Sequence, residues 1–209
     1  AISNDLINCD GRYEIDWADL EEKAKMPETK ALLLCNPHNP VGRVWTKEEL
    51  NRLGEICIKN NVFVLSDEIH MDITMKGYKH TIFASVSEEF ANNSIVFTSP
   101  SKSYNLAGLQ TSNAFVHNEE KRSLFRKELE KSFAFNECGV IGYKACTIAY
   151  KKCSKWLEGA LSVIEKNKTI IENYIKCLIG NIMHGMILRD GLLKEFLHGK
   201  LCMTDLINQ

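Results

Sequence analysis

The chain has 209 residues, 44% of them hydrophobic, which is enough for a globular domain with its own core. Lys and Arg number 26 against 27 Asp and Glu, so the formal net charge of -1 creates no field that attracts nucleic acid or an anionic membrane. No apolar run approaches the roughly 18 residues of a membrane span. We therefore expect a small-molecule ligand, with no nucleic-acid or membrane partner.

The eight cysteines are scattered, with no CxxC pair and no spacing that suits a zinc cluster. We interpret them as buried free thiols of a cytoplasmic, reducing environment. The chain begins at Ala1 with a segment that reads like the middle of a domain. We therefore expect an incomplete chain, truncated at both ends.

The first organised part of the sequence predicts a strand, a helix and a second strand. The apolar run "KALLLC" at 30–35 stops at "NPHNPVG", where prolines and a glycine forbid continuation. Thr46 and Glu49 form a T-x-x-E capping box for a helix that reaches about Asn60. The next apolar run, "VFVL" at 62–65, leads into the acidic cluster "SDEIH". This pattern is typical of parallel crossover units, which bind ligands beyond the carboxyl ends of their strands.

Two more strands are expected at 94–99 and 111–116, separated by the loop "PSKSYNLAGLQ". Asn118 can cap a charged helix that runs to about Lys131. The sequence thus predicts an α/β fold, a mostly parallel sheet flanked by helices and incomplete.

The rest of the chain predicts one long amphipathic helix from 154 to about 178, ended by Gly180. From Asn181 onward we expect only a weak strand and a short helix. The predicted organisation is a partial ligand-binding domain at 1–153, the long helix at 154–180 and a divergent tail at 181–209.

Three post-strand loops each carry a distinctive polar residue: Asn39 in "NPHNPVG", Asp67 in "LSDEIH" and Lys102 in "TSPSKSYN". Singly, each has an ordinary interpretation as a turn residue, a helix cap or a solvated surface charge. Together they follow strands of one sheet, so a single ligand could contact all of them. A cofactor site at this end of the sheet is the better interpretation.

From about Gly11 to Tyr150 the sequence resembles the large domain of fold-type I pyridoxal-phosphate enzymes of aminotransferase class I and II. The motifs N-P-x-N-P-x-G, S-D-E-I and S-x-S-K occur in the order of that family. Within it, "CNPHNPVGRVWTKEEL", "SDEIHMDI", "GYKHTIFASVSEEFA" and "PSKSYNLAGLQTSNA" are most similar to the cystathionine β-lyases of the MalY/PatB type. The resemblance implies pyridoxal 5'-phosphate as cofactor and small-domain and upstream segments beyond this chain.

The resemblance also implies roles for individual residues. Lys102 forms a Schiff base with the cofactor aldehyde and later moves the α-proton of the substrate. Asp67 pairs with the pyridine nitrogen and keeps it protonated, so that the ring accepts electrons. Asn39 and His70 approach the phenolic oxygen of the cofactor, although His70 can also be read as an ordinary core or surface histidine.

The phosphate and the substrate carboxylate are less well provided for. Ser99 and Ser101 supply hydroxyls to the phosphate in the resemblance. Gln110 stands where many aminotransferases carry an arginine, and it brings hydrogen bonds without charge. The β-lyase branch is similar in having Gln there. Arg189 lies in the divergent tail, and we do not assign it the family's role of binding the substrate carboxylate.

Three functions remain open at this point. The first is a carbon–sulfur β-lyase that converts cystathionine or a related L-cysteine S-conjugate to a thiol, pyruvate and ammonia. The second is an aminotransferase, in which the proton returns to the cofactor and no β-substituent leaves. The third is a truncated, non-catalytic or regulatory homologue, because catalysis needs substrate positioning as well as a cofactor. The family also implies a homodimer.

Overall fold

The computed structural model describes residues 1–131 and 138–185, with side chains as far as residue 178. The chain divides into two compact units. One unit combines Ala1–Trp17 with Val163–Gln209, and the other is Ala18–Ser162.

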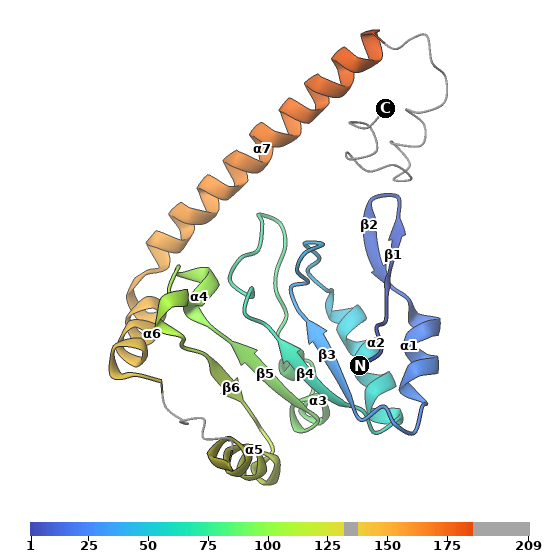
Figure 1. Cartoon of the computed structure of the whole chain (residues 1–209), viewed down its shortest axis with the longest axis vertical. Coiled ribbons are helices and arrows are strands. Elements are labelled where there is room, and N and C mark those ends of the chain that lie inside the picture. Colours follow the sequence, from blue (N-terminus) through green and yellow to red (C-terminus); the bar gives the residue numbers. More distant parts are fainter. Residues whose placement is uncertain (132–137, 186–209) are drawn as a thin grey trace. The chain divides into compact units, whose positions relative to one another are not determined.

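The unit Ala18–Ser162 is built on a four-stranded sheet with the order β3-β4-β5-β6 (Figure 1). Its strands are β3 (Ala31–Cys35), β4 (Phe63–Asp67), β5 (Ser94–Thr98) and β6 (Asn113–Phe115). β3, β4 and β5 are parallel, and β6 runs antiparallel to β5. The prediction of a mostly parallel α/β sheet flanked by helices is confirmed.

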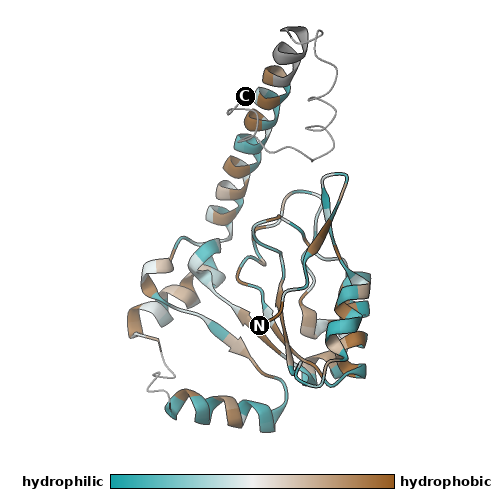
Figure 2. Ribbon diagram, turned by 45° about the vertical axis from the view of Figure 1, so that its right-hand side comes forward, coloured by the Kyte–Doolittle hydropathy of each residue, from teal (hydrophilic) through white to brown (hydrophobic). Residues whose placement is uncertain are grey.

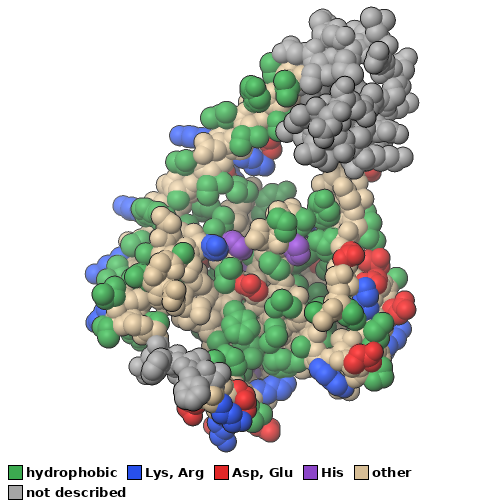
Figure 3. All heavy atoms as spheres, viewed as in Figure 1, with side chains coloured by type: hydrophobic (Ala, Val, Ile, Leu, Met, Phe, Trp, Pro, Cys, Tyr) green, Lys and Arg blue, Asp and Glu red, His purple; other side chains and the backbone are tan. Residues whose placement is uncertain are grey.

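The two faces of this sheet have different surroundings. Residues in register on neighbouring strands point to the same face, and Leu34, Val64 and Val96 are all buried on one of them. On the opposite face Leu33 is 73% exposed. Hydrophobic side chains gather over β3 to β5 in the space-filling view (Figure 3). Within the described residues, the sheet is thus better covered on one face than on the other.

Helix α2 (Lys47–Lys59) has the termini that its sequence predicts. The Thr46 hydroxyl accepts a hydrogen bond from the Glu49 amide at 3.1 Å, and the Glu49 carboxylate accepts one from the Thr46 amide at 2.7 Å. This reciprocal pair satisfies two donors that the first helical turn would otherwise leave free. The helix ends at Asn60, also as predicted.

Helix α3 (Glu88–Asn92) packs against α2. Gly54 of α2 lies against the ring of Phe90, and that ring stacks on Phe83 with centroids 5.3 Å apart. Both helices connect parallel strands that step in one direction along the sheet, and right-handed crossovers of that kind place their helices on the same face. This face is the buried one.

The remaining short elements of this part of the chain surround the sheet. They are α1 (Trp17–Ala24), η1 (Phe83–Ser85), α4 (Pro100–Ser103), η2 (Ala107–Leu109), α5 (Glu119–Lys131) and α6 (Val140–Lys152). The helix predicted after Asn118 is α5, and the Asn118 side chain accepts from the Lys121 amide at 3.0 Å as its cap. α1, α4 and α6 were not predicted from the sequence.

The first residues of the chain form an antiparallel hairpin of β1 (Leu6–Cys9) and β2 (Arg12–Ile15). Its two-residue turn, Asp10–Gly11, has positive φ at both positions, 52° and 84°. Asp-Gly is a favoured pair for such turns because both residues tolerate this backbone region. We did not predict this hairpin, although its turn was visible in the sequence.

Helix α7 (Ser154–Gly185) begins where expected but does not end at Gly180. That prediction is wrong, because a single glycine costs a helix only about 1 kcal/mol and does not remove a backbone hydrogen bond as proline does. Hydrophobic residues recur along the helix (Figure 2). The exposed ones from its middle onward are Val163, Ile164, Ile170, Ile171, Tyr174, Ile175 and Leu178. The strand and helix expected in the tail, and Arg189, lie outside the described residues from 186 onward.

Among the described residues, no helix combines the length and apolarity that crossing a membrane requires. The seven described cysteines are free thiols, as predicted. The expectation that they are buried is wrong for most of them, because only Cys57 is buried, while Cys9 and Cys177 are exposed. Cys57 is buried because it lies on the buried face of α2. The scattered spacing of the cysteines in the sequence does not reveal which of them is buried.

The thiol of Cys57 should be chemically inert in the folded protein. Burial raises its pKa to about 12, so the thiolate that reacts with alkylating agents is scarce near neutral pH. Treatment of the native protein with iodoacetamide at pH 8, followed by mass spectrometry, should label Cys9 and leave Cys57 unmodified. In urea both should be labelled. Equal rates for the two thiols in the folded state would contradict the burial of Cys57.

The contact between Gly54 and Phe90 predicts a stability difference between two glycine substitutions. An added Cβ at Gly54 would overlap the Phe90 ring, whereas at Gly159 of α7 it would meet nothing within 4 Å. Gly54→Ala should lower the free energy of unfolding by about 1–3 kcal/mol through overpacking. Gly159→Ala should leave it unchanged or raise it by up to about 1 kcal/mol. Urea unfolding measures both, and equal midpoints would show that Phe90 does not pack on α2.

Candidate functional site

The sheet brings the predicted residues Asn39, Asp67 and Lys102 to one end. Parallel strands β3, β4 and β5 finish together, since Cys35 pairs with Asp67 and Asp67 pairs with Phe97. Asp67 is the last residue of β4, Asn39 lies in the loop after β3, and Lys102 lies in α4, which begins two residues after β5. The convergence expected from the motif order is therefore present.

Asp67 and Glu68 are adjacent acids with opposite surroundings. Alternation along β4 places Val64, Ser66 and then Glu68 on the buried face, whereas Asp67 points to the other face with Leu65. Glu68 is fully buried and Asp67 is partly exposed. Within the described residues, the Asp67 side chain accepts one hydrogen bond, from the Ile69 amide at 3.2 Å to Oδ1. Its other oxygen is therefore available to a ligand.

The buried carboxylate of Glu68 anchors the segment that follows β4. Its Oε1 accepts from the Ser66 hydroxyl at 2.8 Å and from the Phe83 amide at 2.9 Å. Its Oε2 lies 2.6 Å from Nε2 of His80. These contacts fasten residues far along the chain to the end of β4, because a buried carboxylate without partners would be strongly destabilising.

Asn36 ties the loop after β3 to the same segment. Its amide donates to the Asp67 carbonyl at 2.9 Å, and its side-chain Nδ2 donates to the Thr81 carbonyl at 3.0 Å. Asn36 is fully buried, so this amide crosslinks two post-strand segments from inside the protein. The end of the sheet is thereby held by internal hydrogen bonds.

Asn39 lies exposed in a loop that folds back on itself. The His38 amide donates to the Arg43 carbonyl at 2.7 Å, and the Asn39 amide donates to Cys35 Sγ at 3.4 Å. Trp45, only 2% exposed, closes the base of the loop by donating from Nε1 to the Cys35 carbonyl at 2.9 Å. Burial lowers the pKa of His38, so its imidazole is neutral near pH 7. We therefore interpret His38 as a packing residue of the loop and not as a positive charge of the site.

Ser99 and Ser101 form a hydroxyl pair at the start of α4. The Ser99 hydroxyl accepts from the Ser101 amide at 3.0 Å, and so caps the helix, and it donates to the Thr111 carbonyl at 2.7 Å. The Ser101 hydroxyl lies 2.6 Å from that of Ser99. Since Ser99 already gives its proton to Thr111, Ser101 donates in this pair.

Lys102 and His70 have no intramolecular partner for their side chains among the described residues. Lys102 is exposed and His70 is partly exposed. Within residues 1–131 and 138–178, the amine of Lys102 therefore makes no ion pair that a ligand would have to displace. Gln110 is also exposed, and it ends η2 in the left-handed conformation, with φ of 48°.

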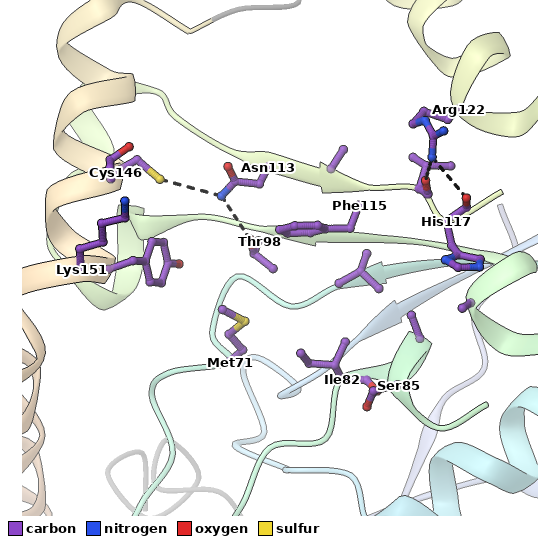
Figure 4. A pocket seen from close by; sticks show the side chains of 17 residues that line it. Met71, Ile82, Ser85, Thr98, Asn113, Phe115, His117, Arg122, Cys146 and Lys151 are labelled. Atoms are coloured by element: carbon purple, nitrogen blue, oxygen red, sulfur yellow. Dashed lines mark hydrogen bonds between the residues drawn. The ribbon is translucent and has the colours of Figure 1, made fainter. Parts of the chain in front are cut away.

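A cavity of about 980 Å³ lies beside β5 and β6 (Figure 4). The residues that line it are not those predicted to bind the cofactor. Val96 and Thr98 line it from the face of the sheet opposite to Asp67. Asn113 points into it between Thr98 and Cys146. None of the predicted site residues contributes to the lining, so we place the functional site at the end of the sheet and not in this cavity.

Sequence reasoning missed Glu68 and Asn36 as residues that hold the site together. Both stand inside the quoted motifs, Asn36 as the first residue of N-P-x-N-P-x-G and Glu68 directly after Asp67 in S-D-E-I, but neither was assigned a role. The alternation of β4 was a usable signal, because it places Glu68 on the same face as Val64. The pairing of Glu68 with His80 needed the fold, since the two residues are twelve positions apart and no regular element connects them.

The chain belongs to the aminotransferase class I and II family, whose sequence profile matches residues 5–182. This confirms the resemblance seen in the motifs. Among curated relatives, cystathionine beta-lyase PatB of Bacillus subtilis is 41% identical over 174 residues, which are 83% of this chain and 45% of PatB. Protein MalY of Escherichia coli is 31% identical over 156 residues, which are 75% of this chain and 39% of MalY.

Solved structures show the same relationship. Cystalysin from Treponema denticola, whose crystal structure contains pyridoxal 5'-phosphate, has a TM-score of 0.81 and 44% identity, covering 84% of this chain and 44% of its own. The pyridoxal-phosphate-bound C-S lyase from Staphylococcus hominis has a TM-score of 0.74 and 36% identity, covering 82% and 42%. The chain thus spans less than half the length of the relatives it matches.

Removal of the Glu68 carboxylate should be strongly destabilising. Glu68→Ala leaves the Phe83 amide and the Ser66 hydroxyl unpaired in the core and should lower the free energy of unfolding by about 3–5 kcal/mol. Glu68→Gln keeps an acceptor and should cost less. The control is Glu128→Gln, in an exposed pair with Lys131, which should change stability by less than about 1 kcal/mol. Urea unfolding of all three is the measurement, and a similar small loss for Glu68→Ala would refute the anchoring role.

Proposed function

We propose that the protein to which this chain belongs is a pyridoxal-phosphate-dependent carbon–sulfur β-lyase. Its substrates would be cystathionine or related L-cysteine S-conjugates, and its products a thiol, pyruvate and ammonia. The observation that carries the proposal is the convergence of Asn39, Asp67 and Lys102 at one end of the sheet. The relatives named cystathionine beta-lyase or C-S lyase support the choice of reaction.

The residues present fit the cofactor. The cofactor aldehyde needs an amine to bind it, and the amine of Lys102 has no intramolecular partner in the described chain. A protonated pyridine nitrogen needs an acceptor, and Asp67 has an oxygen without a partner among the described residues. Ser101 and Ser99 offer hydroxyls within the same turn as the lysine. Asn39 and His70 expose polar atoms from the neighbouring loops.

When bound, the cofactor supplies an electrophilic aldehyde and a ring that accepts electrons from the substrate α-carbon. Asp67 would hold the proton on the ring nitrogen, because a carboxylate stabilises the cationic form. Lys102 would bind the aldehyde and, once freed by substrate, take the α-proton as a general base. Asn39 and His70 would orient the phenolic oxygen. Ser101 would turn its hydroxyl from Ser99 to the phosphate, and Gln110 would donate from its side-chain amide. Ser99 would reach the phosphate by releasing the Thr111 carbonyl.

Transamination is the second candidate, because aspartate aminotransferases are also among the relatives of this chain. That of Geobacillus stearothermophilus is 38% identical over 87 residues, which are 42% of this chain and 22% of that protein. Both reactions begin with the same proton removal by Lys102, and they differ in where the proton goes next. A truncated homologue without catalysis is the third candidate, since the chain covers less than half of each relative.

We further infer a homodimer that binds a small amino-acid substrate in the cytoplasm, with no nucleic-acid or membrane partner. The exposed hydrophobic stripe of α7 and the bare sheet face around Leu33 are surfaces that further protein would cover. The near-zero net charge and the free thiols are consistent with this location. The proposed organisation remains a cofactor-binding part at 1–153, a helix that leads toward a small domain and a divergent tail at 181–209.

Lys102→Ala should abolish covalent cofactor binding. The purified chain mixed with pyridoxal phosphate should show the absorbance band near about 420 nm of the lysine adduct, and the variant should not, because a methyl group cannot bind the aldehyde. Lys127→Ala, an exposed lysine of α5, is the matched control and should keep the band. A wild-type chain without the band would overturn cofactor binding by this chain.

The reaction itself is tested by thiol release from L-cystathionine. A lyase should release thiol and pyruvate, and the Lys102→Ala variant should release neither. Amino transfer to a keto acid without thiol release would replace the lyase assignment by an aminotransferase. Cofactor binding with neither activity would favour the non-catalytic homologue.

A further inference from the structure

Asp72 is an acidic residue of the motif "SDEIHMD" that the proposed chemistry does not use. It lies five residues after Asp67, in the segment that Glu68 anchors. Its Oδ2 accepts a hydrogen bond from the Ser103 hydroxyl at 2.7 Å. Ser103 is only 2% exposed and is the residue directly after Lys102. The carboxylate of the neighbouring loop therefore binds the last residue of α4 by a hydrogen bond.

Asp72 also faces two phenols. Burial raises the pKa of Tyr150, and the nearby Asp72 charge and a hydrogen bond with Asp72 raise it further. Burial and then the Asp72 charge raise the pKa of Tyr104 as well. The two tyrosine rings meet edge to face, with centroids 5.3 Å apart. Asp72 thus accepts from a serine in α4 and lies near a tyrosine in α6.

α4 needs such support because it consists of four residues only, Pro100–Ser103. An isolated single turn of helix is unstable in water, since its nucleation cost exceeds the gain from its few hydrogen bonds. At its start the turn is held by the Ser99 cap, which is bonded to the Thr111 carbonyl. At its end the turn is held by the hydrogen bond from the Ser103 hydroxyl to Asp72, which we call the tie. Lys102 lies between these two points.

Helix α6, which carries Tyr150, is held in place by close packing. Gly142 of α6 packs so closely on Thr111 and Leu109 that an added Cβ would overlap the Thr111 hydroxyl. Tyr150 lies two turns further along the same helix. α6 therefore rests on the Thr111 segment at one end, and it also contacts α4.

We propose that Asp72 is a positioning residue that holds α4 through Ser103 and thereby fixes the backbone from which Lys102 projects. The inference rests on the proposed function, in which Lys102 binds the cofactor aldehyde. Asp72 acts through Ser103 and not on the reacting atoms. Removing it leaves Lys102 chemically intact but carried by a turn that is held by the Ser99 cap at its start and has lost the bond at its end.

The test compares Asp72→Ala, Asp72→Asn, Ser103→Ala and Tyr150→Phe in the full chain. Ser85→Ala is the control, because its hydroxyl makes a hydrogen bond of the same 2.7 Å length, to the Ile82 carbonyl, away from the tie. The first readout is amide hydrogen exchange of residues 101–104 without cofactor. The second is the rate at which pyridoxal phosphate is trapped on Lys102 by borohydride, located by mass spectrometry.

Asp72→Ala and Ser103→Ala should each speed exchange in α4 by about tenfold, because each removes a charge-assisted hydrogen bond. Both should slow trapping at Lys102 by a similar factor. A variant that combines Asp72→Ala with Ser103→Ala should be no slower than Asp72→Ala alone. Asp72→Asn keeps an acceptor for Ser103 and should restore most of the trapping rate. Tyr150→Phe should have a smaller effect, and Ser85→Ala none.

Unchanged exchange and trapping in Asp72→Ala and Ser103→Ala would overturn the inference. Loss of trapping in Asp72→Ala with a normal rate in Ser103→Ala would also overturn it, since the carboxylate would then act without the serine. If Asp72→Ala does not fold in urea titrations, Ser103→Ala and Asp72→Asn decide the question. If even the wild type is not trapped, the proposed function fails and the positioning role with it, whereas exchange in α4 still shows whether the tie exists.

Discussion

The arrangement of this protein depends on the alternation of side chains at the end of β4. Because successive residues of a strand face opposite sides, Asp67 and Glu68 point to opposite faces of the sheet although they are adjacent in the chain. Glu68 enters the core and gathers Ser66, His80 and the Phe83 amide around its two oxygens. Asp67 remains at the end of the sheet with one oxygen open to a ligand. A shift of register by one residue would exchange them and destroy both arrangements.

Internal hydrogen bonds turn three separate loops into one surface. Asn36 joins the loop after β3 to the segment after β4, and Asp72 joins that segment to α4. Ser99 fixes the start of α4 on the Thr111 carbonyl. Loops are usually the mobile parts of a fold, and a site made from them needs such buried or half-buried crosslinks to hold its geometry. Of the residues proposed to bind the cofactor, Asn39 and Lys102 are exposed between these fixed points.

Much of the fold was readable from local patterns. The strands β3, β4 and β5 were predicted as short apolar runs, and α2 was predicted by the Thr46–Glu49 box. α4 was missed because a single turn has no periodicity to detect. The end of α7 was placed too early because glycine is a weaker helix breaker than its use as a stop signal assumes. The hairpin turn at Asp10–Gly11 was legible but was not used.

The sequence by itself determined the order of elements, the family motifs and the residues Asn39, Asp67 and Lys102, because each is encoded within a few neighbouring positions. Only the tertiary structure decided which histidine meets the buried Glu68, that Asn36 bonds to Thr81, and that Asp72 accepts from Ser103. These contacts join residues twelve to more than thirty positions apart. Their partners are chosen by where strands end and segments return in space, and no local pattern carries that information.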